Sequence, residues 1–376
     1  MIERKITLGI KEKFGSGKAI ILLGARQTGK TTLFRNLFQN INQQDILWLN
    51  GDDADVQAMF QHPSSTQLKA VIGNKKFIVI DEAQRIQDIG IKLKLITDQI
   101  KGVQVLATGS SAFELANKIN EPLTGRKWEY QLFPLSFSEM VAHHGLMEEK
   151  RLLQHRMLFG YYPEIVTNPG NEKELLRNLS DSFLYKDILM WERINKPEKL
   201  IRLLKALAFQ IGNQVSINEL SKMVELDNKS VEKYLILLEQ VFVIFHLGSF
   251  SRNLRNELKH SRKYYFYDNG IRNALIANFQ PLENRIDIGA LWENFMVSER
   301  IKHIQYTRLW ANRYFWRTHA QQEIDYIEET DGHLFAYEFK WSPKAKLKFP
   351  KSFKDAYPDS TYELIHSENF EGFLGV

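Results

Sequence analysis

Eight residues near the amino terminus constrain the fold of this chain more than any other feature. They read Gly24-Ala25-Arg26-Gln27-Thr28-Gly29-Lys30-Thr31, the G-x-x-x-x-G-K-[ST] pattern, and Thr32 follows them. The apolar run AIILL precedes the pattern, and the helical sequence TTLFRNLF continues it. A glycine-rich loop between a buried strand and a helix presents backbone N–H groups to phosphate oxygens. These flanks favour an α/β nucleotide site over a chance glycine turn before a lysine, with Lys30 on the outer phosphates of ATP and Thr31 on Mg²⁺.

A second strand signal, Lys76-Phe77-Ile78-Val79-Ile80, ends in the two carboxylates Asp81 and Glu82. A strand buried on both faces can deliver such a pair beside the phosphate loop. We expect Asp81 to hold Mg²⁺ and Glu82 to orient and deprotonate the attacking water. The alternative is an acidic turn that caps the next helix. The pair predicts hydrolysis as well as binding.

Two further polar positions are candidates for contacts to the γ-phosphate. The run VQVLATGSS ends in small hydroxyl residues, and we expect either Thr108 or Ser110 to act as a polar sensor, unless these hydroxyls only cap a helix. Arg126 lies in the turn-like segment EPLTGRKWEY, from which an arginine can reach a phosphate across a subunit boundary. The alternative for Arg126 is a solvated surface position.

Five segments together resemble a prokaryotic group of AAA-type ATPases that carry an uncharacterised carboxy-terminal domain. The segments are GARQTGKTTL, DEAQ, TGSSAFEL, LTGR leading into FPLSF, and GYYPE. The resemblance covers essentially the whole chain and is most specific in the first 165 residues. It implies an AAA-like nucleotide core and assembly into homo-oligomers, in which Arg126 would touch a neighbour's nucleotide. A helical lid arginine of the usual AAA kind is not identifiable.

Length and pattern predict three parts. At about 150 residues per domain, 376 residues predict two to three domains. Short apolar strand-like runs alternate with helical stretches from about residue 17 to 115. Helical periodicity follows from about 137 to 250, and strand-like runs return after about 262. We therefore expect a P-loop NTPase sheet over 1–136, a helical and winged-helix region over 137–263, and a second α/β domain over 264–376.

Composition excludes several classes of site. The chain has no cysteine, so it has no disulfides, thiolate metal sites or cysteine nucleophiles. No stretch without charged residues exceeds 13 residues, which is too short for a membrane-spanning helix, and the amino terminus lacks the pattern of a secretory signal. We expect a cytoplasmic protein without a membrane partner. The net charge of +5 permits a nucleic-acid partner without demonstrating one.

The helical middle contains a candidate nucleic-acid module. Residues 215–244 have the periodicity of a short helix, a turn and a second helix that begins at Asn228 or Ser230. A basic run then lies between two strand-like segments and comprises Arg252, Arg255, Lys259, Arg262 and Lys263. This order is typical of a winged helix whose second helix enters the major groove of DNA and whose wing contacts phosphates. A protein contact or a simple packing unit is the alternative.

Carboxylates near the carboxy terminus suggest a second site. Glu338 and Lys340 lie two residues apart on one face of a predicted strand, and Asp325 lies on an earlier strand. The arrangement resembles the PD-(D/E)XK nuclease superfamily. That resemblance implies an α/β restriction-endonuclease-like domain over 264–376 and Mg²⁺-assisted cleavage of a phosphodiester, with Glu293 as a further acid. It also implies that His319 or Gln322 helps to position the substrate. Glu-x-Lys occurs four times in the chain, so only its strand context favours this copy.

Two functions follow from these patterns. The first is an ATPase that couples its nucleotide state to binding or processing of DNA or RNA. The alternative is a nucleotide-controlled signalling or assembly switch, in which the carboxy-terminal half is an inactive scaffold for a protein partner. The sequence identifies no such partner.

Overall fold

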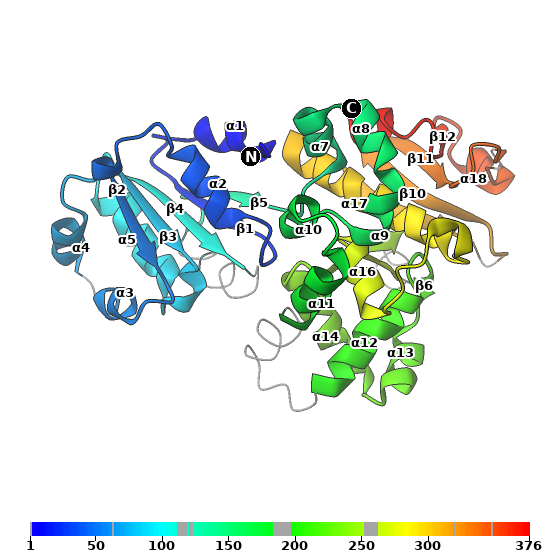
Figure 1. Ribbon diagram of the computed structural model, residues 1–376, viewed down its shortest axis with the longest axis horizontal. Coiled ribbons are helices and arrows are strands. Elements are labelled where there is room, and N and C mark those ends of the chain that lie inside the picture. Colours follow the sequence, from blue (N-terminus) through cyan, green and yellow to red (C-terminus); the bar gives the residue numbers. More distant parts are fainter. Residues whose placement is uncertain are drawn as a thin grey trace. The chain divides into compact units, whose positions relative to one another are not determined.

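The computed structural model describes residues 2–61, 64–110, 119, 123–182, 197–251, 262–318, 320–346 and 349–376 (Figure 1). The chain divides into two compact units. The first comprises residues 1–134 with 240–242, and the second comprises residues 135–239 with 243–376. The first boundary lies close to the predicted one at residue 136.

The first unit is built on a parallel five-stranded sheet. The strand order is β2-β3-β4-β1-β5, with β1 Ala19–Leu23, β2 Ile46–Asn50, β3 Phe77–Asp81, β4 Gln104–Gly109 and β5 Lys127–Gln131. Every residue of β1 and β4 is buried, as expected for central strands of a parallel sheet covered on both faces. The helices described in this unit are α1 Ile6–Lys11, α2 Lys30–Leu37, α3 Ala54–Met59, α4 Ser65–Ile72 and α5 Ile89–Gln99, with the short 3₁₀ helices η1 Gln43–Asp45 and η2 Ala83–Arg85.

The parallel arrangement determines where a site can form. The carboxyl ends of β1, β3 and β4 lie on one edge of the sheet because neighbouring strands run in the same direction. Helix α2 begins at this edge and buries Leu33, Phe34 and Leu37. The residues that follow these three strands therefore meet at one place, as the sequence predicts for an α/β nucleotide domain.

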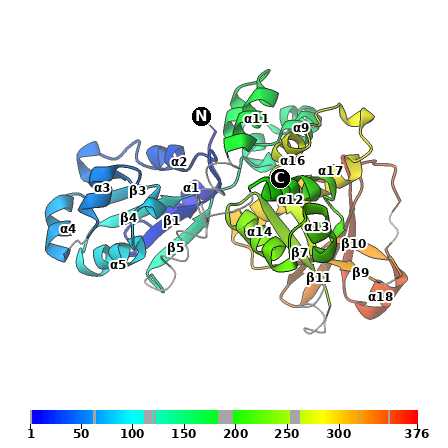
Figure 2. The same ribbon diagram turned by 90° about the horizontal axis from the view of Figure 1, so that it is seen from below.

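The second unit starts with helices. They are α7 Phe137–His144, α8 Leu146–Arg151, α9 Leu153–Phe159, α10 Pro163–Thr167, α11 Glu172–Ser182, α12 Pro197–Phe209, α13 Ile217–Val224 and α14 Asn228–Gln240. Helices α12, α13 and α14 lie together in both views (Figures 1 and 2). The helix–turn–helix prediction is confirmed, since α13 ends at a left-handed Glu225 and the Asp227 carboxylate accepts the Ser230 N–H at 3.0 Å as α14 begins.

A seven-stranded mixed sheet completes the second unit, in the order β12-β11-β10-β9-β7-β8-β6. The strands are β6 Gln214–Val215, β7 Ile244–Ser249, β8 Arg262–Phe266, β9 Asn312–Arg317, β10 Glu323–Thr330, β11 His333–Phe339 and β12 Thr361–Ile365. The remaining helices are α16 Asn269–Leu275, η4 Leu282–Asn284, α17 Ile288–Thr307, α18 Lys351–Ala356 and η5 Gly372–Leu374.

The predicted boundary between residues 263 and 264 does not coincide with a division of the structure. It falls inside β8, which pairs with β6 and β7. Strand β7 also pairs in parallel with β9, so one sheet runs through the region that the sequence divides in two. The change from helical to strand periodicity near residue 263 marks a change of element type within one unit.

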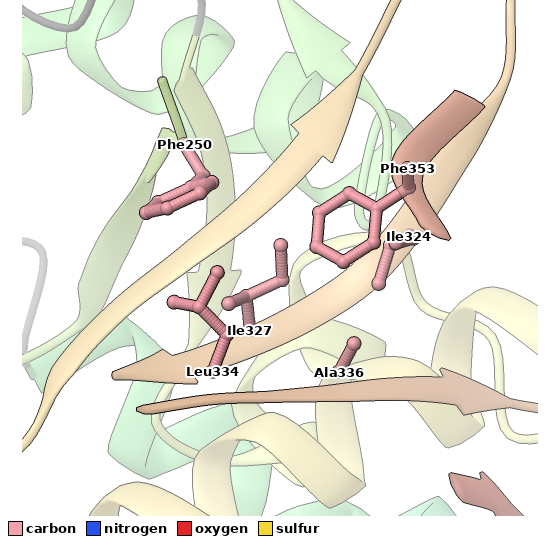
Figure 3. Close-up of a cluster of buried hydrophobic side chains, with 6 residues drawn as sticks. All are labelled: Phe250, Ile324, Ile327, Leu334, Ala336 and Phe353. Carbon is pink, nitrogen blue, oxygen red and sulfur yellow. The ribbon is translucent and has the colours of Figure 1, made fainter. Parts of the chain in front are cut away.

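One face of this sheet packs on a compact apolar cluster (Figure 3). Its members come from β10, β11, α18 and the end of β7, and they are Phe250, Ile324, Ile327, Leu334, Ala336 and Phe353. Ile324 and Ile327 are three residues apart, which strict alternation would place on opposite faces. A register shift between them in the pairing of β9 with β10 brings both into the cluster. Asp325 lies within this irregular stretch.

Candidate functional site

The phosphate loop connects β1 to α2. Gly29 has φ 92°, the left-handed region that favours glycine, and α2 begins at the next residue. A Cβ on Gly24 would lie 2.2 Å from the Leu132 carbonyl oxygen, so only glycine fits there. Lys30 is buried, and its Nζ donates to the carbonyl oxygens of Gly24 at 2.9 Å and Ala25 at 2.8 Å. The Thr28 hydroxyl also donates to Ala25, at 2.8 Å, so the loop closes around the lysine.

Three of the predicted residues meet where the sequence analysis expects Mg²⁺. The Thr31 hydroxyl donates to Asp81 Oδ2 at 2.7 Å, and the Thr108 hydroxyl donates to Asp81 Oδ1. Thr108 is fully buried and its Oγ1 also accepts the Glu82 N–H at 3.0 Å. A hydroxyl and a carboxylate side by side are the hard oxygen donors that Mg²⁺ prefers. These residues therefore fit the predicted ion.

Glu82 is held by a residue that the sequence analysis did not single out. Its backbone lies in the left-handed region at φ 49°, which is uncommon for a residue other than glycine. The buried Gln84 amide donates to Glu82 Oε2 at 2.5 Å and to Ser110 Oγ at 3.0 Å. Thr108 and Ser110 are thus both in the site, Thr108 on Asp81 and Ser110 linked to Glu82. Gln84 is the last residue of the DEAQ segment, so its position two residues after Glu82 could have suggested this contact.

A cleft of about 470 Å³ adjoins the bond between Thr31 and Asp81. Its walls come from α2, β2 and the end of β3 and include Arg35, Phe38, Gln43, Trp48, Leu49 and Asn50. Gln27 and Thr32, which the pattern placed in the cofactor site, are exposed, and Arg26 is half-buried. Space for a ligand therefore exists next to the oxygen donors.

Arg126 lies away from its own phosphate loop. Its backbone carbonyl accepts the Ala19 N–H at 2.9 Å, at the start of β1, whereas the loop follows Leu23 at the other end. A five-residue strand separates the two by roughly 13–17 Å. The Arg126 guanidinium pairs with Asp98 at 2.8 Å. Any contact of Arg126 with a nucleotide would have to involve a second copy of the chain.

The four residues predicted for the second site lie close together. Lys340 Nζ is 2.5 Å from Glu338 Oε1 and 3.9 Å from Asp325 Oδ2. Asp325 also accepts the Phe339 N–H at 2.9 Å, which fixes β10 against β11. Glu293 on α17 joins the cluster through Lys263, which contacts both Glu293 and, at the start of β10, Glu323. His319, a sequence candidate for positioning substrate, lies outside the described residues.

An additional lysine lies inside this cluster. Lys263 is almost fully buried, with Nζ 3.0 Å from Glu293 Oε1 and in contact with Glu323. The Tyr265 hydroxyl donates to the same Glu293 oxygen at 2.7 Å. Burial lowers the pKa of Lys263, but the charges of Glu293, Asp325 and Glu323 outweigh it and hold that pKa above its usual value.

Burial also acts on the carboxylates. It raises the pKa of Glu293 to about 7, even though the charge of Lys263 opposes the shift. Burial and the charge of Asp325 raise the pKa of Glu338 as well. Across the described ranges, no three or more His, Asp or Glu side chains are grouped so as to hold a metal ion. In this arrangement Lys263 and Lys340 pair with Glu293, Glu323 and Glu338, carboxylates that would have to turn toward the predicted Mg²⁺, so the cluster as it stands does not fit that ion.

Lys263 is therefore a correction to the sequence analysis, which placed it in a basic surface run. Alternation in β8 turns Lys263 inward and leaves Arg262 exposed. Arg252, Arg255 and Lys259 lie outside the described residues. In the part of the chain that the structure describes, no helix is both long and apolar enough to cross a bilayer.

Three family models match successive parts of the chain. Residues 16–141 match the family described as an AAA domain, in agreement with the phosphate-loop geometry of the first unit. Residues 150–282 and 288–370 match two families described as domains of unknown function, DUF8612 and DUF4143. Neither description confirms the nuclease-like resemblance.

Similar proteins extend over most of the chain. An uncharacterised protein of Mycobacterium tuberculosis is 26% identical over 346 residues, which are 90% of this chain and 74% of the relative. One of Methanocaldococcus jannaschii is 23% identical over 400 residues, covering 98% and 86%. One of Haemophilus influenzae is 27% identical over 313 residues, covering 74% and 75%.

Solved structures give weaker similarity. Cdc6p of Pyrobaculum aerophilum superimposes with a TM-score of 0.29 at 11% identity, covering 73% of this chain and 93% of that one. AMPPCP-bound DnaA of Aquifex aeolicus gives a TM-score of 0.29 at 16% identity, covering 62% and 86%. TM-scores this low support no conclusion about this chain.

Proposed function

We propose that this chain, whose first unit matches an AAA domain, binds and hydrolyses ATP at the carboxyl edge of the first sheet. The observation that carries the proposal is the bonded set of Thr31, Asp81, Thr108 and Glu82 next to the phosphate loop. It puts a hydroxyl, a metal-binding carboxylate and a candidate base at one strand edge.

Each side chain then has a distinct task. Lys30 exchanges its bonds to the loop carbonyls for bonds to the β- and γ-phosphates, and the loop amides bind phosphate oxygens. Thr31 and Asp81 are the residues that would hold Mg²⁺, which neutralises phosphate charge when bound. Glu82 orients the attacking water and accepts its proton, once it no longer holds the Gln84 amide.

Glu82→Gln tests the assignment of the base. This variant should bind ATP with near-normal affinity but turn it over at least about 100-fold more slowly, because general-base catalysis contributes about that factor or more. Glu129→Gln, an exposed change on β5, is the matched control. Equal turnover by wild type and Glu82→Gln, or loss of ATP binding in this variant, would refute this division of roles.

We further propose that the nucleotide state controls nucleic-acid binding by the helical region. The order α12, β6, α13, α14, β7, β8 supports this, because helix, strand, two helices and an antiparallel hairpin is the order of a winged helix. Lys229 and Lys233 lie exposed on α14, the helix that would enter a groove.

Fluorescence anisotropy with DNA and RNA over a range of salt concentrations, with and without ATP, tests this coupling, which predicts that ATP changes the affinity. Replacing Lys229 and Lys233 by Ala should weaken binding and make the slope of log K against log salt less negative by about 1.8 on double-stranded DNA. The same double change at the exposed Lys69 and Lys101 of the first unit is the control. Absence of salt-dependent binding by the wild type contradicts the nucleic-acid role.

The buried ammonium of Lys263 favours a second candidate function, a nucleotide-controlled switch whose carboxy-terminal cluster is a protein-binding scaffold rather than a nuclease. In the cluster, Lys263 contacts Glu293 and Glu323, and Lys340 contacts Glu338, so ammonium groups occupy carboxylates that a metal ion would need. A nuclease assay with Mg²⁺ or Mn²⁺ on DNA and RNA, comparing wild type with Asp325→Ala, separates the two. Cleavage that requires Asp325 would establish the nuclease and exclude the scaffold.

A further inference from the structure

Arg4 makes contacts that its position near the amino terminus does not suggest. Its side chain is buried, with only 7% of the residue exposed. One guanidinium nitrogen, Nη1, donates to the Thr28 carbonyl in the phosphate loop at 2.7 Å. The other, Nη2, donates to the Phe133 carbonyl at 2.7 Å. Arg4 therefore joins the loop to the segment that leaves the first unit.

A second contact joins the same two segments. The Leu132 N–H donates to the Leu23 carbonyl at 2.7 Å, immediately before the loop. Gly24, the first loop residue, approaches the Leu132 carbonyl so closely that no Cβ can be accommodated. The beginning of the loop and its Thr28 carbonyl are thus both fixed to residues 132 and 133.

The chain between the two units is held on its other side as well. Pro134 is the last residue of the first unit's main segment and Leu135 begins the second. Within the second unit, the Leu135 N–H donates to the Tyr161 carbonyl at 2.9 Å, and its carbonyl accepts from Lys302 Nζ at 2.9 Å. Phe133 and Leu135 are both buried. Phe133 is therefore held by a hydrogen bond within the first unit, and Leu135 by hydrogen bonds within the second.

Phosphate binding must disturb this arrangement at one point. Lys30 Nζ donates to the carbonyls of Gly24 and Ala25, and these bonds compete with bonds to phosphate oxygens. When Lys30 turns toward a phosphate, those carbonyls lose a charged donor and the loop backbone readjusts. Thr28 lies in the same loop, and Arg4 holds its carbonyl. A change in the loop is thereby transmitted to the guanidinium.

We propose that Arg4 is a positioning residue that transmits the occupancy of the phosphate loop to residues 133–135, where the chain first passes from one unit to the other. This inference rests on the proposed function, because it requires ATP at the loop. Arginine suits the role because its planar guanidinium can donate to two separate acceptors through two different nitrogens. A lysine has a single ammonium nitrogen and bridges two such acceptors less well. The structure gives each nitrogen its own carbonyl.

Hydrogen exchange of full-length protein tests the proposal, with the ATP analogue AMPPCP and Mg²⁺ as the probe. In the wild type, the analogue should slow exchange in residues 24–31 and change it at the Leu135 amide. Arg4→Met should keep the effect in residues 24–31, with ATP affinity reduced about tenfold to hundredfold, and lose the effect at Leu135. Lys11→Met, an exposed change on α1, should behave as wild type.

Arg4→Lys keeps the charge and guards against a folding defect in Arg4→Met. It should recover most of the ATP affinity but not the full response at Leu135, because the second donor nitrogen is missing. An unchanged response at Leu135 in both Arg4 variants, or a wild-type response confined to residues 24–31, would overturn the inference while leaving the proposed ATP site intact. No effect at residues 24–31 in the wild type would overturn the proposed function itself.

Discussion

Thr108→Val removes one hydroxyl while nearly preserving the shape of the side chain. Thr108 Oγ1 donates to Asp81 Oδ1 and accepts the Glu82 N–H at 3.0 Å, and the residue is fully buried. The substitution deletes a bond to a carboxylate, typically about 1.5–3 kcal/mol, and leaves the partly buried Glu82 N–H without this acceptor, at the low end of about 1–3 kcal/mol. Both losses arise from the same atom, Thr108 Oγ1, so they do not simply add. We therefore expect the free energy of unfolding to fall by about 3 kcal/mol.

The same change should affect turnover more than binding. Glu82 keeps its left-handed backbone only because neighbours hold it, and Thr108 supplies its N–H acceptor. Misplacement of the base by about 1 Å costs about 100-fold in rate. The Lys30 contacts to the loop are separate from Thr108, so ATP affinity should change by less than about threefold.

Chemical denaturation, nucleotide titration and a steady-state ATPase assay measure these three quantities. Thr97→Val is the matched control, since Thr97 donates only to helix carbonyls at Leu93 and Lys94 and should lose about 1 kcal/mol or less, with no loss of turnover. Thr108→Ser keeps the hydroxyl and should retain most activity. Wild-type turnover in a folded Thr108→Val protein would refute the reasoning.

Three further predictions concern other parts of the chain. Burial raises the pKa of Asp287, but hydrogen bonds from Arg285 and Arg272 outweigh this effect and lower the pKa to about 2. The ionised Asp287 therefore stabilises the fold by about 1–2 kcal/mol above pH about 4, and this contribution is lost as the pH falls toward 2. In acid denaturation, Asp287→Asn should make stability depend less on pH in this range, and an unchanged pH profile would contradict the prediction. Gly160→Ala should lower the melting temperature strongly, because a Cβ would lie 2.0 Å from an Asp268 oxygen at φ 74°, and a wild-type melting curve would show that the packing is looser. If Arg126 serves a neighbour's nucleotide, mixing the two inactive variants Arg126→Ala and Lys30→Ala should restore part of the ATPase rate, and the absence of restoration would exclude action in trans.

The sequence predicted that Thr31, Asp81 and Thr108 lie together because its signal is local there. The spacing from Gly24 to Thr31 and the carboxylates after β3 are determined by chain segments that each fold in one way. Parallel pairing then places Asp81 beside Thr31 without further information. The sequence did not identify Gln84 as the partner of Glu82. A single glutamine two residues after the carboxylate does not form a recognisable motif.

The second unit was predicted less completely because its arrangement depends on distant pairings. Glu293, Asp325, Glu338 and Lys340 lie close together as expected, but Lys263 enters the cluster through the pairing of β8 with β7 and β6. In the sequence Lys263 is one cation among several in a basic run. Only the register of β8 shows that it faces inward.

Isothermal titration calorimetry of the purified protein with ATP and Mg²⁺ tests the central claim most directly. The account predicts a single saturable heat with the wild type and its near-complete loss with Lys30→Ala, because that change removes the cation that faces the β- and γ-phosphates. Folded wild-type protein that gives no heat, or equal heats for the two proteins, would contradict it.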